Sequence, residues 1–196
     1  MASTSWTVAS ASIQGSREAN EDACVATNHC GGVFDGVGGV AGGQAAAQAA
    51  ASHLERAVAD ADPMAKLQEA VLRTGGATTA TIMRWDSGDA WSIGDSSLLH
   101  VRADGVDQPF RADGVGHVLT QWLGKPEMKP QRTRLNVHPG DCVVLCTDGV
   151  HRLLDVADIA RRARALPPEE AVAQILADVE QRGAPDNATV VVAKRN

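Results

Sequence analysis

The chain has 196 residues, enough for one well-buried core, and 44% of them are hydrophobic, as in ordinary globular proteins. Its formal net charge is −6 and it has no run of lysine or arginine, which argues against a nucleic-acid or anionic-membrane partner. It also lacks the roughly 20 consecutive apolar residues of a membrane span and the basic-then-apolar start of a secretory signal, so we expect a cytoplasmic protein.

Hydrophobic periodicity predicts clusters of strands separated by pairs of helices. The expected strands cover residues 6–14, 23–28, 32–35, 78–85, 90–94, 97–102, 106–111, 133–137, 142–146 and 188–193. The expected helices cover residues 40–59, 64–73, 156–165 and 168–181. The first helix is rich in alanine, which favours a helix and lets it lie close to a sheet. With no internal repeat or linker, the pattern indicates one largely antiparallel α+β domain, residues 1–196.

Acidic residues stand at the ends of two apolar strands. Val33 and Phe34 lead into Asp35-Gly36, and strand 142–146 leads into Asp148-Gly149. A continuous apolar run that ends in Asp-Gly is expected of a buried strand that delivers an acid to the edge of a sheet. Taken alone, each segment is also a common turn. Glycine permits close backbone approach, so Gly36 could turn its carbonyl oxygen toward an ion held by Asp35.

Seven short motifs occur along the chain in one order. They are R-x-x-N-E-D at 17–22, D-G-x-G-G at 35–39, G-x-T at 76–78, G-D-S at 94–96, L-T-x-x-L-G at 119–124, T-D-G at 147–149 and D-N-x-T at 186–189. In this order the chain resembles the metal-dependent protein phosphatases, also called type 2C serine/threonine phosphatases. Each motif alone is a weak signal, but the whole series spans nearly the entire chain. The resemblance implies a four-layer αββα sandwich, in which two antiparallel β-sheets are flanked by helix pairs.

The resemblance also implies a centre for two Mn²⁺ or Mg²⁺ ions, with a third ion at a looser position. The implied metal ligands are Asp35, which would bridge both ions, the Gly36 carbonyl, Asp148, Asp186 and, for the looser position, Asp95. Oxygen ligands favour these hard ions over zinc. None of the six histidines is expected to be a ligand.

Other residues of the motifs would support the metal centre. Arg17 would hold the substrate phosphate, because its planar guanidinium matches two phosphoryl oxygens, and with Asp35 and Asp148 it forms the expected catalytic set. Glu21 and Asp22 would act through ordered waters. Asn187 would fix the loop that carries Asp186.

The implied reaction is the hydrolysis of phosphoserine or phosphothreonine in a phosphoprotein substrate, by water activated at the metal centre of a monomeric enzyme. One alternative is a catalytically silent phosphoprotein-binding module of the same fold. It is disfavoured because the acids and Arg17 are all present, and mutually repelling acids have no physical reason to stay together in a silent copy. A second alternative is a metal-dependent phosphodiesterase or a phosphatase of small phosphate esters.

The chain departs from the family pattern beside the expected site. The family usually has a longer segment, the flap, before the motif at 119–124, whereas only residues 112–118 remain here. Val37 stands where some members carry a histidine proposed as general acid, so another group or water would protonate the leaving group. We therefore expect a compact, bacterial-type member with an open metal centre.

Overall fold

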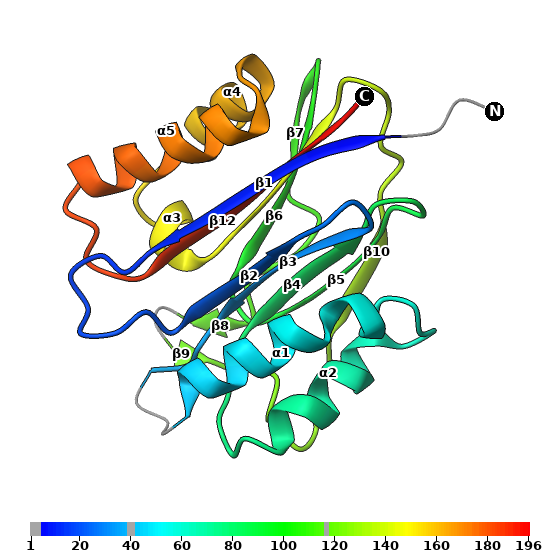
Figure 1. The fold of residues 1–196 in the computed structure, drawn as a ribbon, viewed down its shortest axis with the longest axis vertical. Helices are drawn as coiled ribbons and strands as arrows, with labels where there is room; N and C mark the ends of the chain where they lie inside the picture. The colour runs from blue at the N-terminus through cyan, green and yellow to red at the C-terminus, as the bar shows by residue number, and fades with distance from the viewer. Residues whose placement is uncertain (1–4, 39–41, 116–117) are drawn as a thin grey trace.

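The computed structural model describes residues 5–38, 42–115 and 118–196, and it forms two sheets that lie face to face (Figure 1). Sheet A has the strand order β1-β12-β11-β6-β7, and sheet B has the order β10-β5-β4-β3-β2. Sheet A contains β1 (Trp6–Ile13), β6 (Ser97–Arg102), β7 (Gly105–Asp107), β11 (Cys142–Cys146) and β12 (Ala188–Arg195). Sheet B contains β2 (Asp22–Ala26), β3 (Cys30–Asp35), β4 (Ala80–Arg84), β5 (Asp89–Ile93) and β10 (Gln131–Arg134). Neighbouring strands in both sheets are antiparallel.

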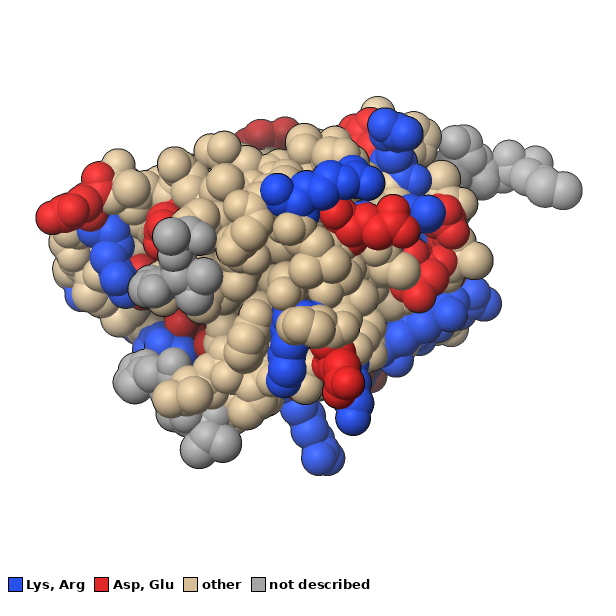
Figure 2. Space-filling view, turned by 90° about the horizontal axis from the view of Figure 1, so that it is seen from below, with Lys and Arg blue, Asp and Glu red and all other residues tan. Residues whose placement is uncertain are grey.

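Helices cover the outer face of each sheet (Figure 1). The pair α1 (Gly43–Ala57) and α2 (Pro63–Leu72) packs on sheet B, and the pair α4 (Val156–Ala165) and α5 (Pro168–Gln181) packs on sheet A. The expected αββα sandwich is therefore confirmed. Among the helices of the described residues, none has the length and apolar character needed to cross a membrane. On the face below α1 and α2, acidic and basic side chains are interspersed among uncharged residues (Figure 2).

Alternate residues of β11 enter different hydrophobic cores. Val143 and Leu145 pack between the two sheets, whereas Cys142, Val144 and Cys146 pack under α4 and α5. Successive side chains of a strand point to opposite faces, so a strand with both faces covered must be apolar throughout. This explains the continuous apolar run in the sequence. A third core joins sheet B to α1 and α2, where the alanines of α1 allow close packing.

Several element bounds differ from the prediction. The helix expected at 40–59 runs from Gly43 to Ala57, and Val40 lies outside the described residues. Gly39, the last glycine of the D-G-x-G-G motif, also lies outside them. The strand expected at 106–111 is shorter because β7 pairs only with the end of β6. The strand expected at 133–137 begins earlier, as β10, where alternate arginines of the strand bond to Asp89.

Three short elements have no counterpart in the prediction. They are α3 (Asp148–His151) and a hairpin of β8 (Gly114–Val115) and β9 (Val118–Leu119). Elements of two to four residues are too short to show a hydrophobic period. The β8–β9 hairpin occupies the shortened flap segment, 112–118, of which residues 116–117 lie outside the described part of the chain.

Strand pairing brings the acidic motifs to one end of the sandwich. In sheet A, Cys146 at the end of β11 pairs with Ser97 at the start of β6 and with Val190 near the start of β12. In sheet B, Asp22 at the start of β2 pairs with Asp35 at the end of β3. Because antiparallel neighbours place the end of one strand beside the beginning of the next, the acids before and after these strands gather at the same edge. This edge lies near α3, β8 and β9 in Figure 1.

Candidate metal centre

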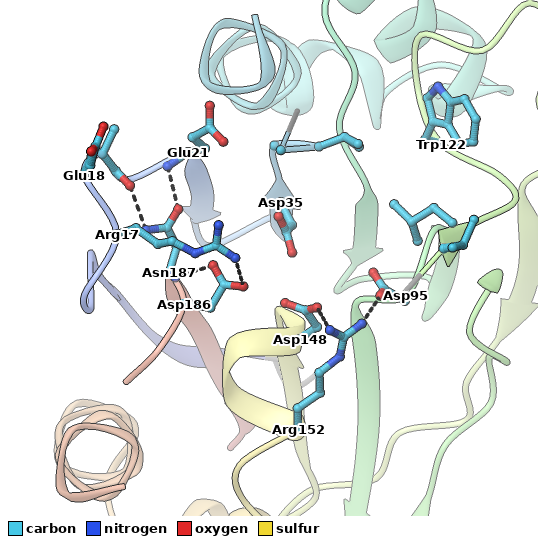
Figure 3. Close-up of a pocket in the computed structure, with 16 residues that line it drawn as sticks. Arg17, Glu18, Glu21, Asp35, Asp95, Trp122, Asp148, Arg152, Asp186 and Asn187 are labelled. Carbon is cyan, nitrogen blue, oxygen red and sulfur yellow. Dashed lines mark hydrogen bonds and ion pairs between the residues drawn. The ribbon is translucent and has the colours of Figure 1, made fainter. Parts of the chain in front are cut away.

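A pocket of about 960 Å³ opens at this edge. Figure 3 shows Asp35, Asp95 and Asp148 pointing toward one another in the middle of the pocket. Arg17 lies on one side of these acids, and Trp122 lies on the opposite side. The pocket therefore has a charged floor between a polar and an apolar wall.

Asp35, Asp95 and Asp148 form a compact group that spans both sheets. One carboxylate oxygen of each lies within 4.8 Å of the other two. Asp35 ends β3 of sheet B, whereas the other two acids lie beside strands β6 and β11 of sheet A. The backbone of Asp35 is fixed by Thr79, whose hydroxyl accepts from its N–H at 3.1 Å and whose N–H donates to its carbonyl at 2.8 Å. Such a cross-sheet group suits metal ions, since the fold holds the acids at short range.

The close approach of these acids raises their pKa values. Burial, followed by the charges of Asp22 and Asp148, holds the pKa of Asp35 well above its ordinary value. Burial and Asp148 also raise the pKa of Asp95. A carboxylate that is poorly solvated and faces like charges resists ionisation. The group thus favours a bound cation.

Asp22 lies behind this group and joins the two sheets. Its Oδ2 accepts hydrogen bonds from the hydroxyl groups of Thr147 at 2.9 Å and Thr189 at 2.6 Å. Burial raises the pKa of Asp22 to about 6, although both hydroxyl groups oppose the shift. The sequence predicts the same water-mediated role for Glu21 and Asp22, but the structure separates them: Glu21 lines the pocket, and Asp22 is buried against the threonines.

We predict that the metal-free protein loses stability as the pH rises from about 4 to about 6. An aspartate in the unfolded chain has a pKa near 3.8, whereas the pKa of Asp22 in the folded protein is about 6. Between these values the folded state keeps a proton that the unfolded state has lost, so stability falls with rising pH through this interval. A shift of this size corresponds to at most about 3 kcal/mol, and the raised pKa values of Asp35 and Asp95 act in the same direction.

Urea unfolding in the presence of a chelator, at a series of pH values, measures this effect. Asp22→Asn is the informative variant, because its amide oxygen still accepts from both threonine hydroxyls while its charge is gone. We expect a smaller loss of stability in this variant than in the unmodified protein. Stability that rises over the same interval in both proteins would contradict the prediction.

Asp186 lies on the polar wall of the pocket and is bound to Arg17. Arg17 Nη2 donates to Asp186 Oδ2 at 2.7 Å, and Asp186 is not part of the group formed by Asp35, Asp95 and Asp148. The sequence predicts metal binding by Asp186 and phosphate binding by Arg17. The structure brings both residues to the pocket but pairs them with each other. The Arg17 side chain is 56% exposed, which leaves it free to rotate toward another partner.

Asn187 fastens the loop before β2 to the loop before β12. Its Oδ1 accepts from the N–H of Glu21 at 2.9 Å, and its Nδ2 donates to the carbonyls of Gln14 at 2.8 Å and Ala19 at 2.9 Å. These bonds hold the segment that carries Arg17 and Glu21 beside the segment that carries Asp186. Asn187 therefore supports two loops of the site rather than one.

Arg152 is a pocket residue that the sequence reasoning missed. Its Nη1 lies 2.9 Å from Asp148 Oδ2, and its Nη2 donates to Asp95 Oδ2 at 2.9 Å (Figure 3). The available signal was its spacing from Asp148, since residues four apart share one face of a helix.

Two glycines let the acidic motifs pack against backbone. A Cβ atom at Gly149 would lie 1.9 Å from the carbonyl oxygen of Asn187. One at Gly36 would lie 2.7 Å from the carbonyl oxygens of Glu21 and Gly43. Glycine thus follows the acid in both Asp-Gly pairs because another segment of backbone occupies the space of a side chain.

The pocket composition fits divalent metal ions. Six carboxyl groups and two guanidinium groups line it. With every acid ionised, as metal binding would require, the formal excess is four negative charges, which two divalent ions would balance. Among the described residues, neither histidine nor cysteine lines the pocket. Carboxylate and carbonyl oxygens suit Mg²⁺ and Mn²⁺.

Comparison with protein families identifies the chain. Residues 36–196 match the family model of stage II sporulation protein E, SpoIIE. The chain belongs to the SpoIIE family. The match begins at Gly36, so it contains six of the seven motifs, the one at 35–39 without Asp35. Together with the structural similarities below, it confirms the resemblance to metal-dependent protein phosphatases. No curated protein sequence matches the chain.

Solved structures share the fold of this SpoIIE-family chain over nearly its whole length. PppA, a key regulatory component of T6SS in Pseudomonas aeruginosa, is 24% identical, with a TM-score of 0.88 over 97% of this chain and 98% of PppA. The catalytic domain of the serine/threonine phosphatase PstP, solved with two manganese ions, is 24% identical, with a TM-score of 0.85 over 98% and 99% of the two chains. MsPP, a PPM phosphatase from Mycobacterium smegmatis solved with cacodylate, is 27% identical, with a TM-score of 0.83 over 97% and 98%.

Proposed function

We propose that this SpoIIE-family protein hydrolyses phosphoserine or phosphothreonine in proteins and depends on two Mn²⁺ or Mg²⁺ ions. The observation that carries the proposal is the group of Asp35, Asp95 and Asp148, which lies in one pocket with Arg17. A phosphate monoester carries negative charge that repels a nucleophile. Its hydrolysis therefore requires positive charge at the phosphoryl oxygens and a nucleophile that is active near neutral pH.

The acids of the pocket would hold the ions. Following the family resemblance, Asp35 would contact both ions, the Gly36 carbonyl would bind one, and Asp148 and Asp186 would bind the other. When bound, such ions lower the pKa of water and neutralise phosphoryl oxygens. Glu21, on the pocket wall, would orient water around the ions.

Arg17 would bind the substrate phosphate after an exchange of partners. Without metal, the guanidinium of Arg17 and the carboxylate of Asp186 neutralise each other. If Asp186 binds an ion, Arg17 becomes available to a phosphate, which suits its planar fork of N–H donors. Metal binding would thereby prepare the phosphate site.

The apolar wall of the pocket favours a peptide substrate over a small polar ester. Val118, Leu119 and Trp122 line this wall, and Val118 is 70% exposed. Leu119 and Trp122 are half-buried, so the wall offers a protein substrate an apolar surface beside the polar site. They would contact the residues next to the phosphorylated side chain.

Turnover of a phosphothreonine peptide, with and without metal, tests the proposed function. We expect no turnover after exhaustive chelation and recovery when Mn²⁺ is added, because the nucleophile depends on the ions. An aryl phosphate is assayed in parallel. Hydrolysis of the aryl phosphate but not of the peptide would indicate a small-ester phosphatase. Binding of the peptide without hydrolysis of either substrate would indicate a silent binding module. Equal peptide turnover before and after chelation would refute metal dependence.

A further inference from the structure

We propose that the guanidinium of Arg152 is a built-in cation on the Asp95–Asp148 side of the metal centre and takes the place of a third metal ion. This inference rests on the proposed two-metal function. It revises the expectation from the sequence, in which Asp95 and Asp148 share a third, looser ion. It gives Arg152 a role in setting how many ions the site binds.

The geometry of Arg152 matches that of a shared cation. Each of its terminal nitrogens lies 2.9 Å from a different carboxylate, one on Asp148 and one on Asp95. The side chains of these acids are 12% and 14% exposed, so water screens their charges poorly. A guanidinium stays protonated at any working pH, so it keeps one positive charge between the two carboxylates at all times.

The fold holds Arg152 in this position. The N–H of Arg152 donates to the carbonyl of Asp148 at 2.9 Å, at the end of α3. The preceding residue, His151, places its Nε2 2.9 Å from the backbone carbonyl of Asp95. Two consecutive residues thus attach α3 to the loop between β5 and β6. The contact between Arg152 and the acids is therefore part of the packing between two segments.

The charges of the pocket lead to the same conclusion. With Arg17 and Arg152 present, the pocket has an excess of four negative charges, which two divalent ions would balance. Replacing Arg152 with a neutral residue would raise the formal excess to five and free one oxygen on each of Asp95 and Asp148. A third cation would then gain both charge and ligands. Arg152 would thus limit the site to two ions.

Titration calorimetry of Mn²⁺ into chelated protein tests the proposal. We expect the unmodified protein to bind two ions per chain and Arg152→Ala to bind three. The double variant Arg152→Ala/Asp95→Asn should return to two, because the third position would lose a charged ligand. Arg152→Lys, which keeps the positive charge, should also bind two. Arg152→Gln is titrated beside Arg152→Ala and should also bind three ions; glutamine can still donate a hydrogen bond, so the test does not depend on the folding of the alanine variant.

Arg161→Ala is the matched control. Arg161 also pairs with an aspartate, Asp158, but on the exposed surface of α4. The Arg161→Ala variant should bind two ions, and its melting temperature should equal that of the unmodified protein. Metal-free Arg152→Ala should melt roughly 5 °C lower. Saturating Mn²⁺ should remove most of that difference.

Two results would overturn the role of Arg152. One is a third ion in the unmodified protein that disappears in Asp95→Asn, and the other is an unchanged ion count in both neutral Arg152 variants. These readouts are independent of turnover. If the unmodified protein binds two ions but does not hydrolyse the peptide, the proposed function is refuted and the role of Arg152 stands. If it hydrolyses the peptide with three bound ions, the role of Arg152 is refuted and the proposed function stands.

Discussion

Asp35→Asn is expected to remove nearly all of the proposed phosphatase activity and, at the same time, to make the metal-free protein more stable. Asp35 is the acid expected to contact both ions, and residues that merely support metal ligands already cost about 10- to 100-fold when replaced. We therefore expect a loss of turnover of at least about 100-fold. Stability should rise because the substitution removes a charge that burial and three neighbouring acids oppose.

Peptide turnover with saturating Mn²⁺ and thermal melting with a chelator measure the two effects separately. Asp86→Asn, in the exposed turn after β4, is the control for the same chemical change. It should alter neither quantity. Turnover close to that of the unmodified protein in Asp35→Asn would show that Asp35 does not bridge the ions.

The second large effect is expected from Gly149→Ala. Alanine is the better helix former, so in an open helix this change would stabilise the protein. Here its Cβ atom would lie 1.9 Å from the carbonyl oxygen of Asn187, and both segments are backbone. The start of α3, which carries Asp148, must move away from the loop that carries Asp186. We expect a loss of about 4 kcal/mol in the free energy of unfolding, together with weaker Mn²⁺ binding.

Gly105→Ala provides the matched comparison. Gly105 begins β7, and a Cβ atom there would meet no heavy atom within 4 Å. Its free energy of unfolding and its Mn²⁺ affinity should match those of the unmodified protein. Urea unfolding and calorimetry give both quantities. If Gly149→Ala were as stable as Gly105→Ala, the two segments would not be in the close contact described here.

The sequence predicts those parts of the site that depend on local patterns. Asp35 and Asp148 each follow a continuous apolar run, and that pattern indicates a buried strand without knowledge of its neighbours. The position of Asp95 depends in addition on strand register, since Ser97 pairs with Cys146. The family resemblance implied that Asp95 lies near Asp148, whereas hydrophobic periodicity could not do so.

Contacts between distant segments and short elements could not be predicted. Asp22 binds the hydroxyl groups of Thr147 and Thr189, and nothing in the local sequence indicates these partners. Arg152 reaches Asp95 only because the short helix α3 turns back toward the β5–β6 loop. The roles assigned to the metal ligands and to Arg17 stay predictions, and the variants above address those of Asp35 and Asp95.

The strand order of sheet A has a consequence for biosynthesis. The strand β12 follows all other strands of the two sheets in the sequence, yet it lies between β1 and β11 and pairs with both. During translation the first and eleventh strands therefore emerge without the partner that joins them, and long-range pairing of this kind forms slowly. Asp186 emerges immediately before that strand. Until residues 188–195 have been made, the growing chain would expose an unfinished sheet, and the proposed metal site would be incomplete.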